Sequence, residues 1–258
     1  MTEDQRFSLL TGDEMKEVAS VTLAMLCLIA CTVVCGCSRE EPIPDRTKKL
    51  YSQNDEELII RDFFDDRRGG VFVDVGSNHW EELNNTYFLE KYLRWSGIAI
   101  DAQAQFAEGY KKFRPKTKFF SYAVSDRSGE TVKLYLAWGL SSVDRDWLEK
   151  FSGKIIEQWA LDVPTITLND LLEQNHIAKI DFLSMDIEGA EPAALAGFDI
   201  EKYEPELVCI EASEENRKKL SAYFEQHGYE PIDEKRDFTN WYFKPKASRG
   251  EAGSAPAE

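Results

Sequence analysis

The chain has 258 residues, and 43% of them are hydrophobic and 12% aromatic, which is enough for one large folded domain with accessory segments. Its formal net charge is −16, from 47 acidic and 31 basic residues. Sequence-independent nucleic-acid binding depends on clustered Lys and Arg, so this acidity argues against a nucleic-acid partner. Composition leaves the oligomeric state open.

An uncharged, mostly apolar run covers residues 18–37, after an N-terminal segment at 1–17. It is about twenty residues long, which is enough for a transmembrane helix. Four of the five cysteines lie in it, and the fifth, Cys209, falls in a predicted core strand, so the globular part has no cysteine pair for a disulfide. We therefore expect attachment to a membrane through this run.

Two kinds of attachment fit the run. Lys and Arg are sparser before it than after it, so a single-pass anchor would place the C-terminal domain in the cytoplasm. Alternatively, Met15 begins a lipoprotein-type signal, in which Leu28-Ile29-Ala30-Cys31 resembles a bacterial lipobox. In that case a lipidated cysteine holds the protein at the membrane.

The folded region is predicted at residues 55–245. A charged, proline-containing tether at 38–54 precedes it, and a disordered tail at 246–258, rich in Ala, Gly, Ser, Glu and Pro, follows it. The predicted elements, in chain order, are helix 55–66, strand 71–75, helix 83–95, strand 97–101, helix 104–113, strands 117–124 and 131–137, helices 144–161 and 167–173, strand 180–185, helix 190–196, strand 207–210, helix 214–226, and strands 229–232 and 240–243. This alternation predicts an α/β fold: a doubly wound, mainly parallel, Rossmann-like sheet that ends in antiparallel strands.

The first predicted strand ends in the turn Asp74-Val75-Gly76-Ser77-Asn78. Gly76 allows a tight turn and lets the backbone approach a ligand closely. The second strand ends in Asp101, at the position where an acid commonly accepts hydrogen bonds from ribose hydroxyls. Turns commonly contain Asp and Gly, but the two strand ends together predict a site for an adenosine-containing cofactor.

Further acids follow the other predicted strands. The acids at the strand ends are Asp74, Asp101, Asp126, Asp186 and Glu211. The densest group, Asp186, Glu188 and Glu191, suits a reaction centre, where Asp186 and Glu188 could act as a general base or hold Mg²⁺. Glu211 could join them, whereas Glu191 could simply place negative charge at a helix N-terminus.

Six blocks of the sequence, at 71–78, 85–90, 95–97, 123–126, 167–172 and 181–191, resemble FkbM-family methyltransferases. The resemblance extends over roughly residues 55–245. Its most specific element is Asp186-Ile187-Glu188-Gly189-Ala190-Glu191, directly after a strand. Members of this family use S-adenosylmethionine, mostly for O-methylation. The resemblance therefore implies an O-methyltransferase that acts on a hydroxyl of a small molecule, sugar or glycan.

The resemblance also implies roles for single residues. The residues that would surround the cofactor are Asp74, Gly76 and Asn78 at the methionine and ribose, Asp101 at the ribose hydroxyls, and Val124 and Asp126 at the adenine. Asp186 and Glu188 would face the sulfonium and the acceptor hydroxyl. No metal ligand is implied, and Mg²⁺ stays an alternative for the acids.

The sequence departs from the family pattern at two loops. The family usually has a second glycine soon after Asn78, but here His79-Trp80 follow, and Trp80 would narrow the pocket or cap the next helix. The second-strand acid is followed by Ala102-Gln103-Ala104 instead of a proline-containing loop. The altered glycine loop leaves an alternative function, a non-catalytic, membrane-attached binding or scaffold domain on a methyltransferase-like fold.

Overall fold

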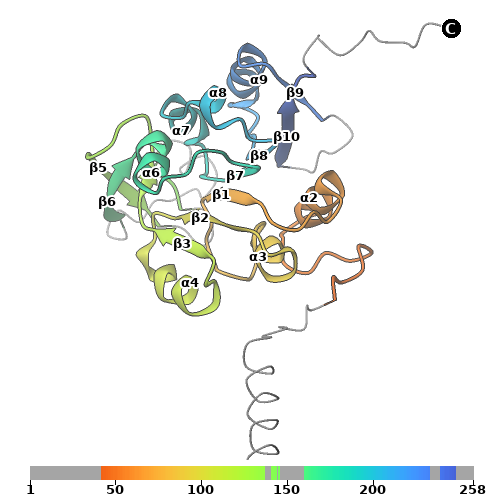
Figure 1. Cartoon of the computed structure of the whole chain (residues 1–258). Coiled ribbons are helices and arrows are strands. Elements are labelled where there is room, and N and C mark those ends of the chain that lie inside the picture. Colours follow the sequence, from red (N-terminus) through yellow and green to blue (C-terminus); the bar gives the residue numbers. More distant parts are fainter. Residues whose placement is uncertain (1–41, 137–140, 144, 146–159, 233–238, 248–258) are drawn as a thin grey trace, which may run out of the picture. The chain divides into compact units, whose positions relative to one another are not determined.

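The structure is a computed structural model, and it describes residues 42–136, 141–143, 145, 160–232 and 239–247 (Figure 1). The segment at 1–17, the apolar run at 18–37 and most of the helix predicted at 144–161 lie outside the described residues. Among those that are described, no helix is both long and apolar enough to cross a membrane. The described residues from Ile43 onward group into one compact unit, so the second half of the predicted tether packs with the domain.

A seven-stranded sheet lies at the centre, in the order β3-β2-β1-β7-β8-β10-β9 (Figure 1). The strands are β1 (Val71–Val75), β2 (Ser96–Ile100), β3 (Thr117–Phe120), β7 (Phe182–Met185), β8 (Leu207–Glu211), β9 (Tyr229–Pro231) and β10 (Asn240–Pro245). The first five in the spatial order pair in parallel, and β10 pairs antiparallel with both β8 and β9. The predicted mixed α/β fold with a mainly parallel sheet is confirmed.

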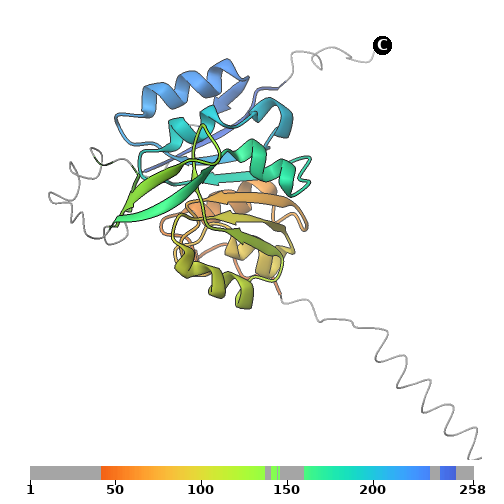
Figure 2. The same cartoon turned by 90° about the vertical axis from the view of Figure 1, so that its left-hand side faces the viewer.

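Helices cover both faces of this sheet (Figure 2). The helices are α2 (Glu56–Phe64), α3 (Tyr87–Leu93), α4 (Ala107–Phe113) after the short 3₁₀ helix η1 (Ala104–Phe106), α6 (Leu168–Gln174), α7 (Glu191–Ala196), α8 (Ile200–Tyr203) and α9 (Arg217–Gln226). Phe72 of β1 packs in a core with α2 and α3, while its neighbour Val73 packs in a core with α6, α7 and α9. Successive strand residues point to opposite faces, so a strand buried on both sides is mainly apolar.

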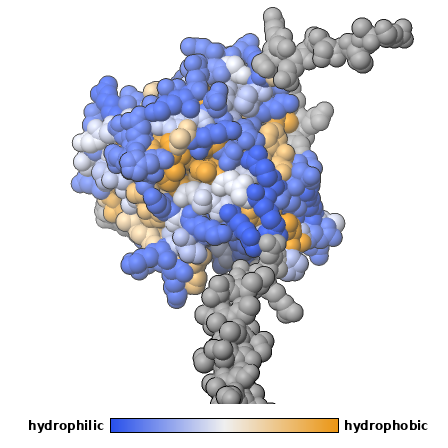
Figure 3. Space-filling model, in the orientation of Figure 1, coloured by the Kyte–Doolittle hydropathy of each residue, from blue (hydrophilic) through white to orange (hydrophobic). Residues whose placement is uncertain are grey.

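Hydrophilic residues cover most of the face in Figure 3, and apolar residues gather in smaller patches between them. This surface agrees with the large excess of acidic residues in the sequence.

A small second sheet was not predicted. It consists of β4 (Ala123–Val124), β6 (Ala160–Ile166) and β5 (Thr131–Tyr135) in that order. The predicted strand at 117–124 divides into β3 and β4, and the predicted helix at 144–161 overlaps the start of β6. The strand β6 could not be recognised from the sequence, because Asp162 and Pro164 interrupt the usual strand pattern.

Candidate active site

A cavity of about 390 Å³ lies at the carboxyl ends of the central strands. The predicted site residues that line it are Gly76, Asn78, Asp101, Val124, Asp186 and Glu188. Val75 pairs with Ile100 of β2 on one side and with Met185 of β7 on the other. This register brings the ends of β1, β2 and β7 level, so the residues that follow them meet at one edge of the sheet.

Gly76 lies where the β1 turn touches the segment after β7. Its φ is +79°, and a Cβ added there would lie 1.7 Å from the backbone oxygen of Asp186. Its N–H donates to Ile100 O at 2.8 Å, and the N–H of Asp186 donates to Val75 O at 2.9 Å. No other residue type fits both this conformation and this approach.

Asp101 is buried and held in a fixed orientation at the cavity wall. One carboxylate oxygen accepts the N–H of Asn78 at 2.9 Å, and the other accepts the N–H of Gln103 at 2.8 Å. Burial raises the pKa of Asp101 above its ordinary value, although the two N–H donors oppose this. A carboxylate oxygen has two lone pairs, so each can still accept a hydrogen bond from a ligand hydroxyl.

Two predicted cofactor residues, Asp74 and Asp126, do not line the cavity. Asp74 is buried beneath it and accepts a hydrogen bond from the hydroxyl of Thr86 at 2.7 Å. Burial raises the pKa of Asp74 to about 6. The side chain of Asp126 is half exposed and lies near its neighbours Ser125 and Arg127.

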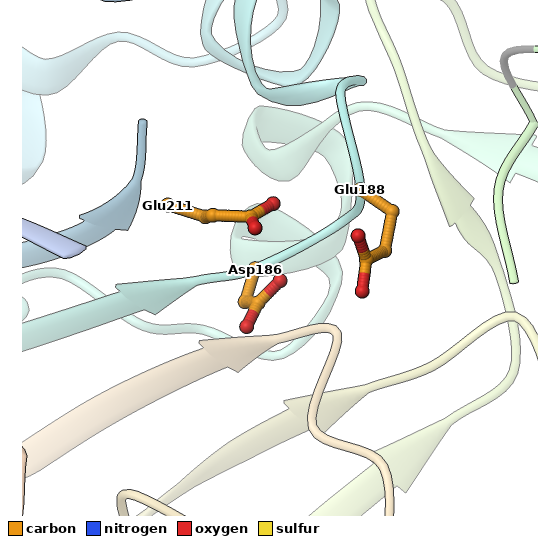
Figure 4. Close-up of side chains that lie close together, drawn as sticks. All are labelled: Asp186, Glu188 and Glu211. Atoms are coloured by element: carbon orange, nitrogen blue, oxygen red, sulfur yellow. The ribbon is translucent and has the colours of Figure 1, made fainter. Parts of the chain in front are cut away.

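Asp186, Glu188 and Glu211 form an acidic trio at the ends of β7 and β8, and their carboxylates point toward one another (Figure 4). Each offers an oxygen within 4.8 Å of the others, close enough to share a metal ion. Burial, with the negative charges of Asp186 and Glu191, raises the pKa of Glu188 to about 8. Burial also raises the pKa values of Asp186 and Glu211, although Asp186 is open to the cavity.

Asp186 and Glu211 hydrogen-bond to each other, but two oxygens of the trio stay unsatisfied. One carboxylate oxygen of Glu188 and one of Glu211 are buried, with no hydrogen-bond partner among the described residues. Glu188 also has a φ of +54°, an uncommon conformation for a residue other than glycine. Buried polar atoms normally find partners, so an arrangement of this kind suits a ligand that brings positive charge or a proton.

Glu191 supports the loop that carries Asp186 and Glu188. It is fully buried, and one of its oxygens accepts the N–H of Ile187 at 3.1 Å and that of Gly189 at 3.2 Å. Its contacts thus fix the backbone of this loop and go beyond the helix-terminus role that the sequence left open.

Trp80 does not narrow the cavity. Neither His79 nor Trp80 is among the residues that line it. The Trp80 ring packs on Gly109 of α4, where an added Cβ would lie 1.8 Å away, and it stacks on Phe113 at a centroid distance of 5.6 Å. Gly109 thus makes room for the indole on the far side of the loop.

Several lining residues could not be predicted from the sequence, because they come from loops outside the motifs. They include Gln53 before α2, the exposed Leu83, Tyr122 between β3 and β4, and Ser141 and Val143. Only the folded chain brings these segments beside the strand ends.

Comparison with known proteins gave a family match and several structural likenesses. The family model described as "Methyltransferase FkbM domain" matches residues 74–231. A precorrin-6y C5,15-methyltransferase from Geobacter metallireducens is 11% identical, with a TM-score of 0.45 over 78% of this chain and 93% of that chain. A TehB-like SAM-dependent methyltransferase from Corynebacterium glutamicum is 12% identical, with a TM-score of 0.44 over 78% and 90%. No curated protein matches.

Proposed function

Since the chain belongs to the FkbM methyltransferase family, we propose that it transfers a methyl group from S-adenosylmethionine to a hydroxyl of a small molecule, sugar or glycan. The observation that carries the proposal is the convergence on one cavity of the glycine turn, the oriented Asp101 carboxylate and the acids Asp186 and Glu188. Two of these features suit the cofactor, and the third suits the reaction.

The residues of the cavity fit the cofactor. Asp101 keeps free lone pairs for ribose hydroxyls, Gly76 leaves the backbone open to close approach, and Val124 offers an apolar wall for the adenine. When bound, S-adenosylmethionine supplies an activated methyl group on a positively charged sulfonium. The cavity volume of about 390 Å³ lies within the range of small-molecule sites.

The acidic trio supplies the complementary charge and a base. A cation near Asp186, Glu188 and Glu211 lowers their pKa values again, because it favours the ionised forms. Glu188, with a pKa of about 8 before the cation binds, then accepts the proton of the acceptor hydroxyl as that oxygen gains the methyl group. Asp186, beside it, faces the positive charge.

The apolar run at 18–37 would hold this enzyme at a membrane, as a single-pass anchor or through a lipidated cysteine. Extraction of membranes with alkaline carbonate and with detergent tests this on the full chain. We expect release by detergent alone, and release by carbonate would contradict it. A reporter fused at the C-terminus then distinguishes a cytoplasmic domain from an exported one.

Calorimetry with S-adenosylhomocysteine tests the cofactor site directly. We expect Asp101→Asn to weaken binding about tenfold or more, since a hydrogen bond to a charged group is worth about 1.5–3 kcal/mol. Asp126→Asn is the matched control, because Asp126 is also a strand-end acid but lies outside the cavity. Absence of binding by the folded wild type would contradict the proposed function.

Trp80→Phe should leave S-adenosylhomocysteine affinity within about threefold of wild type, because the ring packs on α4 and a smaller aromatic ring is usually tolerated there. The same calorimetric titration checks this. A loss of binding in a folded variant would instead mean that the indole shapes the cofactor site, and would revive the scaffold interpretation.

A further inference from the structure

A buried polar network lies beneath the loop at 77–80, which carries the cavity residue Asn78. Its central members, Asn84, Thr86, Tyr110 and Arg114, are all buried, and none of them lines the cavity. Asn84 and Thr86 come from the segment before α3, Tyr110 from the middle of α4 and Arg114 from its C-terminal end, so the fold brings together separate parts of the chain.

The network binds the loop through its backbone carbonyls. The amide of Asn84 donates to Ser77 O and to His79 O, both at 3.0 Å. Tyr110 donates its hydroxyl to Ser77 O at 3.1 Å, and Arg114 donates to Trp80 O at 3.0 Å. Side chains of Asn84, Tyr110 and Arg114 thus hold three of the four backbone carbonyls of this loop.

The same network reaches the end of β1. Arg114 donates to the hydroxyl of Thr86 at 3.2 Å, and that hydroxyl donates in turn to Asp74 at 2.7 Å. A hydroxyl has one proton to give, and the short distance assigns it to the carboxylate. On its other side, Arg114 donates to Glu90 at 2.6 Å, so two buried carboxylates flank the guanidinium charge.

Fixed carbonyls determine where the rest of the loop points. Asn78 has a φ of +48°, in the left-handed region that Asn adopts more readily than most residues other than glycine. In that conformation its N–H donates to Asp101, the acid that orients toward the ribose in the proposed site. The loop therefore keeps its shape without the second glycine that the family usually has after Asn78.

We propose that Arg114, Asn84 and Thr86 are positioning residues, which hold the 77–80 loop and Asp101 in the geometry that binds the cofactor. The inference rests on the proposed function, because it names how the chain prepares the S-adenosylmethionine site. It assigns these residues a role in binding although none of them touches the ligand.

Thr86 offers the cleanest test, since Arg114 variants would leave Asp74 and Glu90 as unpaired buried charges. Thr86→Val keeps the shape and removes the hydroxyl, and Thr86→Ser keeps the hydroxyl. We expect calorimetry with S-adenosylhomocysteine at pH 7.5 to show about a tenfold weaker affinity for the valine variant and near wild-type affinity for the serine variant. Equal affinity of a folded Thr86→Val and the wild type would overturn the inference.

The pH profile separates positioning from a merely structural role. The groups that act on Asp74 are Thr86, Arg114, Ser184, Asp101 and Asp186, with Tyr110 also nearby. Wild-type affinity should fall as the pH drops through about 6, where Asp74 becomes protonated. The Thr86 hydroxyl lowers the pKa of Asp74, so Thr86→Val should move this midpoint to higher pH and Thr86→Ser should restore it. An unchanged midpoint would contradict the inference.

Asn84→Ala extends the test, with Asn175→Ala as its matched control, because Asn175 also donates to a backbone carbonyl but lies outside the cavity and the network. Hydrogen exchange of the wild type keeps the inference testable if a variant fails to fold. The amide of Asn78 should exchange slowly without ligand, and rapid exchange would overturn the inference. Failure of the wild type to bind S-adenosylhomocysteine would count against the proposed function instead.

Discussion

Replacing Gly76 with alanine should abolish S-adenosylhomocysteine binding and lower the free energy of unfolding by roughly 3 kcal/mol or more. The added Cβ would lie 1.7 Å from the backbone oxygen of Asp186, and Gly76 also has a φ of +79°. The backbone cannot yield cheaply here, because the N–H of Asp186 is bonded to Val75 O at the end of β1. Relief of the clash must therefore move Asp186 and open the sheet edge that forms the cavity.

Gly129→Ala is the matched control for this prediction. Gly129 has a φ of +81°, but nothing lies within 4 Å of an added Cβ. It should therefore cost only the strain of the left-handed conformation, about 1–2 kcal/mol, and leave ligand binding unchanged. Urea unfolding and calorimetry of both variants check this. If both variants lost stability and ligand binding equally, the close approach of the β1 turn to the segment after β7 would not be essential.

Replacing Glu188 with glutamine should stabilise the protein at alkaline pH while it removes the proposed base. Burial beside Asp186 and Glu191 raises the pKa of Glu188 to about 8, against an ordinary value of 4.5. Between these values the folded state keeps a proton that the unfolded chain has lost, so wild-type stability falls as the pH rises from about 4.5 to about 8. Glutamine is neutral throughout, so its advantage should be absent below that window and complete above it. We expect about 2 kcal/mol, well under the full value of the pKa shift, because solvent screens this half-buried carboxyl.

Thermal unfolding at pH 4 and at pH 8.5 measures this effect. Glu108→Gln serves as the control, since the Glu108 side chain is 89% exposed. Transfer of labelled methyl groups to a panel of hydroxyl acceptors should fall by about 10²–10⁴ in Glu188→Gln, as expected when a general base is lost. Undiminished transfer would exclude Glu188 as the base. If the stability of Glu188→Gln relative to the wild type were the same at both pH values, the raised pKa of Glu188 would be contradicted.

The fold could be predicted from the alternation of apolar strand segments with helices. Apolar runs at β1, β2, β7 and β8 alternate with helices, and each run is too apolar to face water on either side. Parallel strands must present their carboxyl ends at one edge, so the turn residues Gly76, Asp101 and Asp186 were predictable as neighbours before any contact was known. The strand β6 was not predicted, because Asp162 and Pro164 interrupt its pattern.

Within the site, the sequence predicted which residue types gather at the strand ends but not the directions of their side chains. Asp74 and Asp101 both follow apolar runs, yet Asp101 lines the cavity and Asp74 faces Thr86 beneath it. Their different surroundings come from loops, whose shapes depend on partners far away in the chain. Arg114, which fixes Trp80 O from 34 residues away, is such a partner.

The amino-acid sequence by itself thus determined the order of the elements, the sheet edge at which the cavity lies and the residue types gathered there, because these follow from local periodicity and from the geometry of parallel strands. Only the tertiary structure decided that Glu191 supports a loop, that Trp80 turns away from the cavity and that Glu211 joins Asp186 and Glu188. Those outcomes depend on packing and buried hydrogen bonds between distant segments, for which a single sequence carries no local signal.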